Sequence, residues 1–425
     1  MTDFSFIHAA DVHLDSPLAS LRRLDGNAAE RIERASRRSV ELLINAALEH
    51  EVSAVLIAGD VFHGPVKDAG AGLWLERQLR QLTRAGISVF LIRGNHDFVS
   101  PSARISTWPS GVYQFSTEQP ETRILDNVGM AVHGQSFAAR EQSSDLASNY
   151  PAPIPGYFNV GLLHTSLAGS PMHDTYAPTS VEILENKGYD YWALGHIHLR
   201  SSTSLSTKCY IGYSGCMQGR HIREIGPKGC NLVQVSGGSI SHVRFVPTDS
   251  LRWYELSVDI SAAQQLLDVE DLVIEQLRTQ CLDADGRPLA VRVNLTGPTL
   301  LHADLTRSQI QTKLAEILCQ SLLEHADIWL ESMRIGTSLP NSAEPADFDL
   351  PLKYLSMVAD EIREDPVLQK ELQGTLDELY RKTQSELNEI QWPPVMESTR
   401  NSEFKRLWNA AENLLLARIA GSRQA

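Results

Sequence analysis

The chain has 425 residues, of which 42% are hydrophobic and 21% are charged. These values exclude a chain that is disordered throughout, and the length allows roughly two or three domains with cores of their own. No apolar run reaches the roughly 18 residues of a membrane helix, and residues 1–4 lack the basic and apolar regions of a secretory signal. Five cysteines without a C-x-x-C pair favour a reducing, cytoplasmic setting without disulfides.

The net charge of −14 is unevenly distributed along the chain. Residues 1–248 hold 21 Lys and Arg against 23 Asp and Glu, whereas residues 249–425 hold 17 against 29. The acidity therefore belongs mainly to the C-terminal part. Any anionic substrate would have to be bound by the first 248 residues.

The first 248 residues alternate strand-like runs with helical patterns. Apolar runs typical of buried strands occupy 4–10, 54–58 and 88–92, and helical patterns occupy 29–49 and 72–85. This alternation indicates a layered α/β sheet. From residue 129 onward strands dominate, and we expect them at 130–133, 159–163, 191–194, 209–212, 231–235 and 242–246. The pattern predicts an α/β fold with a four-layered core, two packed β-sheets flanked by helices, over residues 1–248.

A break near Pro247-Thr248-Asp249 ends this region. Beyond it, the alternation at 254–260, helices at 269–281 and 307–325, and strands at 290–295 and 328–335 predict a small α/β capping domain over residues 249–338. A polar linker over 338–345 follows. Residues 346–425 show two amphipathic helical patterns, at 368–379 and 404–415. We interpret this segment as helical, either binding a partner or packing on the chain's own body.

Five segments place metal-ligand residue types just after a strand-like run. They are Asp11-Val12-His13, Gly59-Asp60-Val61-Phe62-His63, Gly94-Asn95-His96-Asp97, His164, and Gly195-His196-Ile197-His198. Strand ends in α/β sheets release the chain into the loops that form sites. Five converging segments would make a polynuclear metal site. Its carboxylate, imidazole and amide ligands suit Mn²⁺, Fe²⁺ or Zn²⁺.

In this order, the five segments resemble the signature of the calcineurin-like metallophosphoesterase superfamily. His63, three residues after Asp60, resembles the SbcD-like DNA repair exonuclease branch. The segment 213–221, followed by Glu224, is similar to the YhaO-type bacterial subfamily of that branch. The resemblance is strong over residues 1–248, architectural over 249–338 and weak beyond 345.

The resemblance implies a site for two divalent metal ions, with Mn²⁺ as the first choice and Fe²⁺ or Zn²⁺ as alternatives. One metal would be held by Asp11, His13 and His198. The other would be held by Asn95, His164 and His196, and Asp60 would bridge the two.

Three further residues take roles beside the metals in this resemblance. His96 would protonate the leaving alkoxide or stabilise charge on the phosphoryl oxygens. Asp97 would orient His96 or raise its pKa, with a loop cap as the alternative. His63 would contact the phosphate or His96, with a structural histidine as the alternative.

Two sets of basic residues each have a structural and a functional interpretation. The first set is a solvated helix face or a DNA contact: Arg31, Arg34, Arg37 and Arg38. The second set consists of loop residues that could line a substrate groove: His173, Arg220, His221 and Arg223. No substrate-binding residue is assigned from either set.

The leading hypothesis is a two-metal phosphodiesterase that acts on DNA as an exonuclease or endonuclease. The resemblance also implies a homodimer and a partner, an SbcC-like SMC-type ATPase. One alternative is a phosphatase or phosphodiesterase for phosphoproteins or small nucleotides, which the charge balance favours. Another is a non-catalytic scaffold for the ATPase, and the complete set of seven predicted ligands argues against it.

Overall fold

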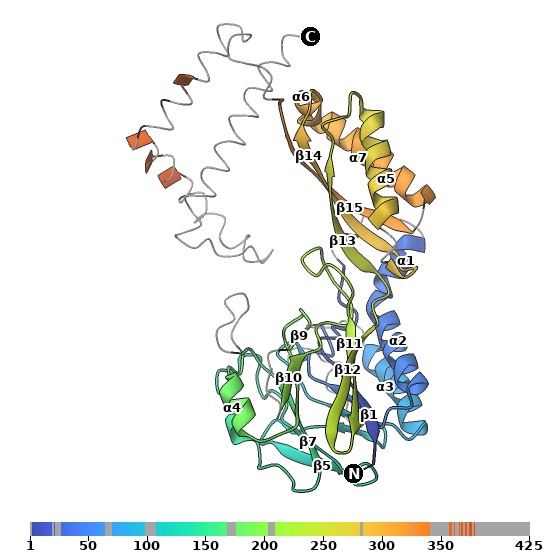
Figure 1. Ribbon diagram of the computed structural model, residues 1–425, viewed down its shortest axis with the longest axis vertical. Helices are drawn as coiled ribbons and strands as arrows, with labels where there is room; N and C mark the ends of the chain where they lie inside the picture. The colour runs from blue at the N-terminus through green and yellow to red at the C-terminus, as the bar shows by residue number, and fades with distance from the viewer. Residues whose placement is uncertain are drawn as a thin grey trace. The chain divides into compact units, whose positions relative to one another are not determined.

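The structure is a computed structural model that describes most of the first 340 residues (Figure 1). The described residues are 2–18, 21, 27–63, 70–97, 108–167, 176–202, 209–280, 284–325, 327–340 and scattered positions between 357 and 378. His173 and nearly all of the segment 346–425 lie outside them. Among the residues so described, no helix is both long and apolar enough to cross a membrane.

The chain divides into two compact units. The first comprises Met1–Tyr254 and Ala284–Ala290, and the second comprises Glu255–Asp283 and Val291–Ala425. The first unit extends past residue 248 because the next residues are bonded back to it. The Gln218 side chain donates to the Leu251 carbonyl at 2.7 Å, and Trp253 Nε1 donates to the Gly219 carbonyl at 2.8 Å.

The first large sheet has six strands in the order β12-β11-β1-β2-β3-β4. They are β1 (Phe4–Ala9), β2 (Ala54–Ile57), β3 (Ser88–Leu91), β4 (Val112–Gln114), β11 (Gly229–Ser236) and β12 (Ser239–Pro247). Strands β1 to β4 are parallel, and β11 and β12 are added antiparallel. Parallel strands bring their carboxyl ends to one edge of the sheet.

The second large sheet also has six strands, in the order β5-β6-β7-β8-β10-β9. They are β5 (Glu121–Leu125), β6 (Met130–Gly134), β7 (Phe158–His164), β8 (Tyr191–Gly195), β9 (Ser201–Ser202) and β10 (Tyr210–Tyr213). Strands β6, β7, β8 and β10 are parallel, so their carboxyl ends also share an edge.

Helices cover the outer faces of both sheets, and the two inner faces share a core. Those of the first unit are α1 (Asn27–Glu33), α2 (Ala35–Glu49), α3 (Gly70–Arg84), α4 (Val181–Asn186) and the 3₁₀ turn η4 (Ala147–Asn149). In β2, Val55 and Ile57 pack with α2 and α3, whereas Leu56 packs between the sheets. In β8, Trp192 and Leu194 pack with α4 and η4. The predicted α/β fold with two large sheets and flanking helices is confirmed.

The second unit contains most of a three-stranded sheet in the order β13-β14-β15, and the first residues of β13 and β14 belong to the first unit. Its elements are β13 (Arg252–Asp259), α5 (Leu266–Gln280), β14 (Leu289–Pro298), α6 (His302–Leu305), α7 (Ser308–His325) and β15 (Ile328–Ser338). Val273 of α5, Leu318 of α7 and Val293 of β14 are buried, and they illustrate how the helices and the sheet share an apolar core.

Candidate metal centre

Every predicted metal ligand lies at or just after the carboxyl end of a parallel strand. The residues by strand are Asp11 and His13 after β1, Asp60 after β2, Asn95 after β3, His164 at the end of β7, and His196 and His198 after β8. Five of these side chains form two groups whose ligand atoms lie within 4.8 Å of one another. The groups are Asp11, His13 and His198, and Asp11, Asp60 and His164.

The two sheets approach each other closely at this edge. His164 Nδ1 lies 2.9 Å from the Ala58 carbonyl oxygen, so its N–H donates across from the second sheet to the first. A Cβ atom on Gly195 would lie 1.9 Å from the same carbonyl oxygen, so only glycine fits there. This contact brings the ligands from the second sheet to those from the first.

The loops of the site hold an unusual backbone conformation. Positive φ angles occur at five residues that are not glycine: Asp11 (51°), His13 (46°), Asp15 (59°), Asp60 (51°) and His196 (99°). Such conformations cost on the order of 1–3 kcal/mol each and persist only where neighbouring contacts fix them. Here the Asp11 N–H donates to the Gly59 carbonyl at 3.1 Å, and the His13 N–H donates to the Asp60 carbonyl at 2.9 Å.

The hydrogen-bond acceptors of the site face one another in a way that fits a cation. Because His164 Nδ1 donates to a carbonyl, its Nε2 lone pair faces Asn95 Oδ1 at 3.0 Å. Lone pairs this close repel unless a cation shares them. His13 Nε2 lies 3.1 Å from His198 Nε2, close enough for both nitrogens to bind one cation. The nitrogen and oxygen donors therefore fit a divalent metal.

The carboxylates of the site support the same conclusion. Asp11 and Asp60 are 1% and 2% exposed. Burial raises the pKa of Asp60 to about 7. Burial, and then the neighbouring Asp60 charge, raise the pKa of Asp11 well above its usual value. Two buried carboxylates side by side are unfavourable as anions unless a bound cation neutralises them.

His196 lies next to this cluster through its backbone. Its N–H lies 3.0 Å from both carboxylate oxygens of Asp11. Its ring packs edge-on against the His164 ring, with 5.3 Å between the centroids. The position is adjacent to the second predicted set of ligands.

The rings of His63 and His96 form a stacked pair next to the His13 ring. Their ring centroids are 5.2 Å apart at an interplanar angle of 20°, and the His96 ring meets the His13 ring edge-on at 4.9 Å. The backbone N–H of His96 donates to Asp60 Oδ1 at 2.9 Å. His63 therefore contacts the His96 ring.

The Asp97 carboxylate is bonded to the backbone of two loops. Its Oδ1 accepts the Phe62 N–H at 2.8 Å, and its Oδ2 accepts the Gly94 N–H at 2.9 Å. These bonds join the loop after β2 to the loop after β3. They support the loop-cap interpretation of Asp97. In this interpretation Asp97 affects His96 only by fixing the position of the loop.

Glu224 is a site residue to which the sequence assigned no role, and Arg220 is one that the sequence left open as a groove residue. Glu224 is buried, and its Oε1 lies 2.6 Å from His198 Nδ1. Accepting that N–H fixes the tautomer of His198, so its Nε2 lone pair faces the metal site. Arg220 Nη2 lies 3.4 Å from the same carboxylate oxygen. The two residues come from the loop after β10, where no strand end marks them as ligands.

Glu224→Gln is expected to lower Mn²⁺ affinity by roughly 10–100-fold, the usual effect of removing a carboxylate that orients a metal-binding histidine. Calorimetric titration of Mn²⁺ into the metal-free protein measures it. Glu41→Gln serves as the control, since Glu41 lies on the surface, away from the strand ends, and pairs there with Arg38. An unchanged Mn²⁺ affinity in Glu224→Gln would refute the orienting role.

Two family models match the chain. Residues 4–200 match the calcineurin-like phosphoesterase family, and residues 253–338 match the middle domain of the metallophosphoesterase YhaO. The second match covers most of the region that the sequence predicted as a small α/β domain.

Proteins similar to this chain include a YhaO protein and Mre11 proteins. It is 34% identical over 355 residues to the uncharacterized metallophosphoesterase YhaO of Bacillus subtilis, an alignment that covers 82% of this chain and 85% of that protein. It is 27% identical to the DNA double-strand break repair protein Mre11 of Methanopyrus kandleri, covering 59% and 58%. Mre11 of Aeropyrum pernix is also 27% identical, covering 60% and 63%.

The extent of the Bacillus subtilis alignment and the match to the phosphoesterase model confirm the resemblance found in the sequence. The buried carboxylates and imidazoles at the strand ends agree with it. The chain belongs to the calcineurin-like metallophosphoesterases and is a homologue of YhaO.

Proposed function

We propose that this metallophosphoesterase is a two-metal phosphodiesterase that cleaves DNA. The observation that carries the proposal is the pair of ligand groups that share Asp11 at one buried sheet edge. Two divalent cations, with Mn²⁺ as the first choice, would activate water as a nucleophile and neutralise the phosphate. The similarity to two Mre11 proteins, whose names state a role in DNA double-strand break repair, favours DNA as the substrate.

A nuclease assay tests this function directly. With Mn²⁺, the protein is expected to cleave single- or double-stranded oligonucleotides and to stop when EDTA removes the metal. A phosphopeptide and a small nucleotide diester, offered in parallel, represent the second candidate function, which the net charge of −14 favours. Hydrolysis of those two without cleavage of DNA would replace the proposal.

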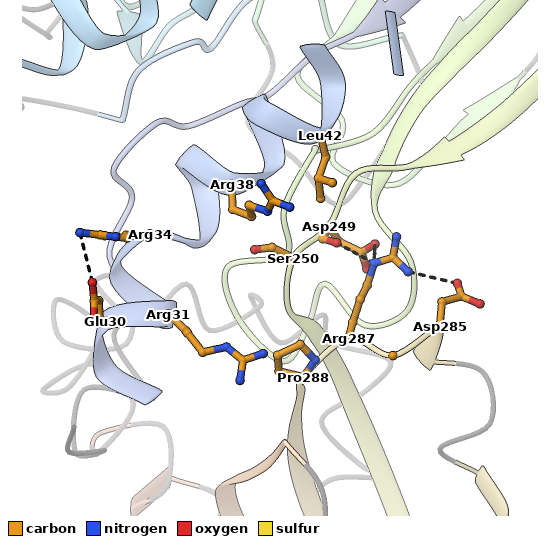
Figure 2. Close-up of a pocket in the computed structure, with 11 residues that line it drawn as sticks. Glu30, Arg31, Arg34, Arg38, Leu42, Asp249, Ser250, Asp285, Arg287 and Pro288 are labelled. Atoms are coloured by element: carbon orange, nitrogen blue, oxygen red, sulfur yellow. Dashed lines mark hydrogen bonds and ion pairs between the residues drawn. The ribbon is translucent and has the colours of Figure 1, made fainter. Parts of the chain in front are cut away.

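A cationic wall on the first unit supports DNA as the substrate (Figure 2). Arg31, Arg34 and Arg38 line one side of a cavity of about 610 Å³. The exposed pairs Arg34–Glu30 and Arg38–Glu41 are weak enough for a phosphate to compete with them.

The facing wall of the cavity contributes little free charge. There, Arg287 is paired with Asp249 at 3.1 Å and with Asp285 at 3.2 Å. The cationic wall of Arg31, Arg34 and Arg38 is therefore the one suited to a nucleic-acid backbone.

The triple variant Arg31→Gln/Arg34→Gln/Arg38→Gln is expected to bind duplex DNA more weakly. The slope of log K against log salt should fall by about 0.9 for each phosphate that the variant no longer neutralises. Hydrolysis of bis(p-nitrophenyl) phosphate should be unchanged, because this small diester has a single phosphate, which binds at the metal centre. Fluorescence anisotropy at several salt concentrations measures the DNA affinity.

The matched control is Arg77→Gln/Arg80→Gln/Arg84→Gln on the neighbouring helix α3, which removes the same charge from other exposed positions. An equal loss of affinity in both triple variants would show that only net charge matters. That result would exclude the cationic wall as a DNA-binding surface.

We further propose a homodimer and an SbcC-like SMC-type ATPase as partner, in a cytoplasmic setting. The support is the family resemblance together with the acidic composition of residues 249–425. That acidity suits a protein partner better than a DNA backbone.

A further inference from the structure

Arg220 places a positively charged side chain next to the predicted metal ligands. Its Nη1 lies 3.3 Å from His63 Nδ1, and its Nη2 lies 3.1 Å from His198 Nδ1. The side chain is 15% exposed. The guanidinium therefore reaches both the His63–His96 pair and the predicted metal ligand His198.

A structural role does not account for the hydrogen bonds of this guanidinium. His198 Nδ1 already donates to Glu224 at 2.6 Å and cannot accept from Arg220 as well. The direct contact from Arg220 Nη2 to Glu224 is 3.4 Å long, whereas charge-assisted bonds are usually about 2.7–2.9 Å. Arg220 Nε is buried and has no hydrogen-bond partner among the described residues.

Structural arginine–carboxylate pairs in the same chain look different. Arg37 contacts both oxygens of Asp15 at 2.7 Å. Arg292 contacts both oxygens of Glu331 at 2.8 and 2.7 Å. These are the short, two-pronged pairs that lock an arginine in place. Arg220 has no such partner in the described part of the chain, so its donors suit a ligand that brings its own oxygens.

The chemistry of the guanidinium indicates which ligand it suits. It lies beside imidazole rings and has no short carboxylate pair, and a phosphate group matches the planar fork of arginine.

We propose that Arg220 is a phosphate-binding residue whose guanidinium donates to a non-bridging oxygen of the phosphoester at the metal centre. The inference rests on phosphoester hydrolysis and not on which phosphoester is the substrate. Glu224 then has two roles: it fixes the tautomer of His198, and its Oε2 holds the Arg220 backbone N–H at 2.7 Å.

Phosphate binding separates this role from a structural one. The full-length protein with Mn²⁺ is compared as wild type, Arg220→Gln and Arg220→Lys. Calorimetry gives the Kd of inorganic phosphate, and metal analysis gives the Mn²⁺ content. Arg220→Gln is expected to keep its Mn²⁺ and to bind phosphate about 10–100-fold more weakly, the usual effect of losing a charge-assisted hydrogen bond. Arg220→Lys should be intermediate, because it keeps the charge without the fork.

Arg123→Ala, at an exposed position on strand β5, is the control and should bind phosphate like the wild type. Two outcomes would overturn the inference: phosphate binding in Arg220→Gln equal to the wild type, or loss of Mn²⁺ in both Arg220 variants. The second would show that Arg220 only supports Glu224. Since the probe is inorganic phosphate, a protein that fails to cleave DNA can still pass this test.

Discussion

Replacing Asp60 with asparagine is expected to abolish hydrolysis and to reduce bound Mn²⁺ from two equivalents to at most one. Asp60 Oδ2 lies 3.8 Å from His13 Nε2 and 3.6 Å from His164 Nε2, so its carboxylate faces one histidine of each ligand group, as a bridging ligand would. Asparagine has nearly the same shape but no charge and a single oxygen. The loss should exceed the roughly 10–100-fold of a residue that only supports a ligand. Metal analysis after equilibrium dialysis measures the Mn²⁺ bound.

Thermal stability provides an independent measurement for the same variant. The wild type should gain stability with Mn²⁺, because a ligand that binds only the folded state raises its melting temperature. The asparagine variant should gain much less. Without metal it should be at least as stable as the wild type, since a buried, uncompensated carboxylate has been removed. Asp126→Asn, at an exposed position, is the control, and two equivalents of Mn²⁺ in the Asp60 variant would contradict the bridging role.

The ligand positions could be predicted because they depend on a rule that links sequence to topology. An apolar run followed by polar residues marks the carboxyl end of a buried strand, and parallel strands collect those ends at one edge. The run at 54–58 appears as β2, and Asp60 follows it directly. The same holds for His164 at the end of β7. Strand-end motifs of this kind can therefore be identified in the amino-acid sequence alone.

Elements without a strong apolar pattern were not predicted. Strand β5 has no fully buried residue, and β4 has three residues, of which only Val112 is buried. The helix expected over 29–49 is present as α1 and α2, which meet at Arg34. The apolar spacing continues across the junction, so periodicity alone could not reveal the break.

Contacts between distant segments also could not be predicted from the sequence. Arg37 was grouped with a solvated helix face. In the structure it binds Asp15, in the loop that contains Asp11 and His13, and its guanidinium lies 5.3 Å from the centre of the Trp74 ring. Nothing in the local pattern distinguishes it from Arg34 or Arg38. Such pairings depend on how α2 packs against the loop, which the chain determines only once it is folded.

The role of His96 is where sequence and structure lead to different expectations. The sequence left two roles open, proton donor to the leaving alkoxide or stabiliser of phosphoryl charge. A proton donor needs a partner that keeps the imidazole protonated. Asp97, the expected partner, instead accepts two backbone N–H groups. Burial, then His63 and Arg220, lower the pKa of His96 to about 3. A neutral imidazole that donates one N–H to a phosphoryl oxygen fits these surroundings better.

His96→Ala is therefore expected to keep both equivalents of Mn²⁺ and to lose turnover by about 10²–10³-fold, as when one donor to a developing oxyanion is removed. His50→Ala is the control: His50 lies at the end of α2 and contacts Arg244. Comparing two substrates identifies the mechanism. An oligonucleotide has a poor alkoxide leaving group, whereas bis(p-nitrophenyl) phosphate has an aryl group that leaves without protonation. A donor to the phosphoryl oxygen affects both reactions similarly, so similar losses are expected. A loss confined to the oligonucleotide would instead make His96 the general acid, and loss of Mn²⁺ would make it part of the metal site.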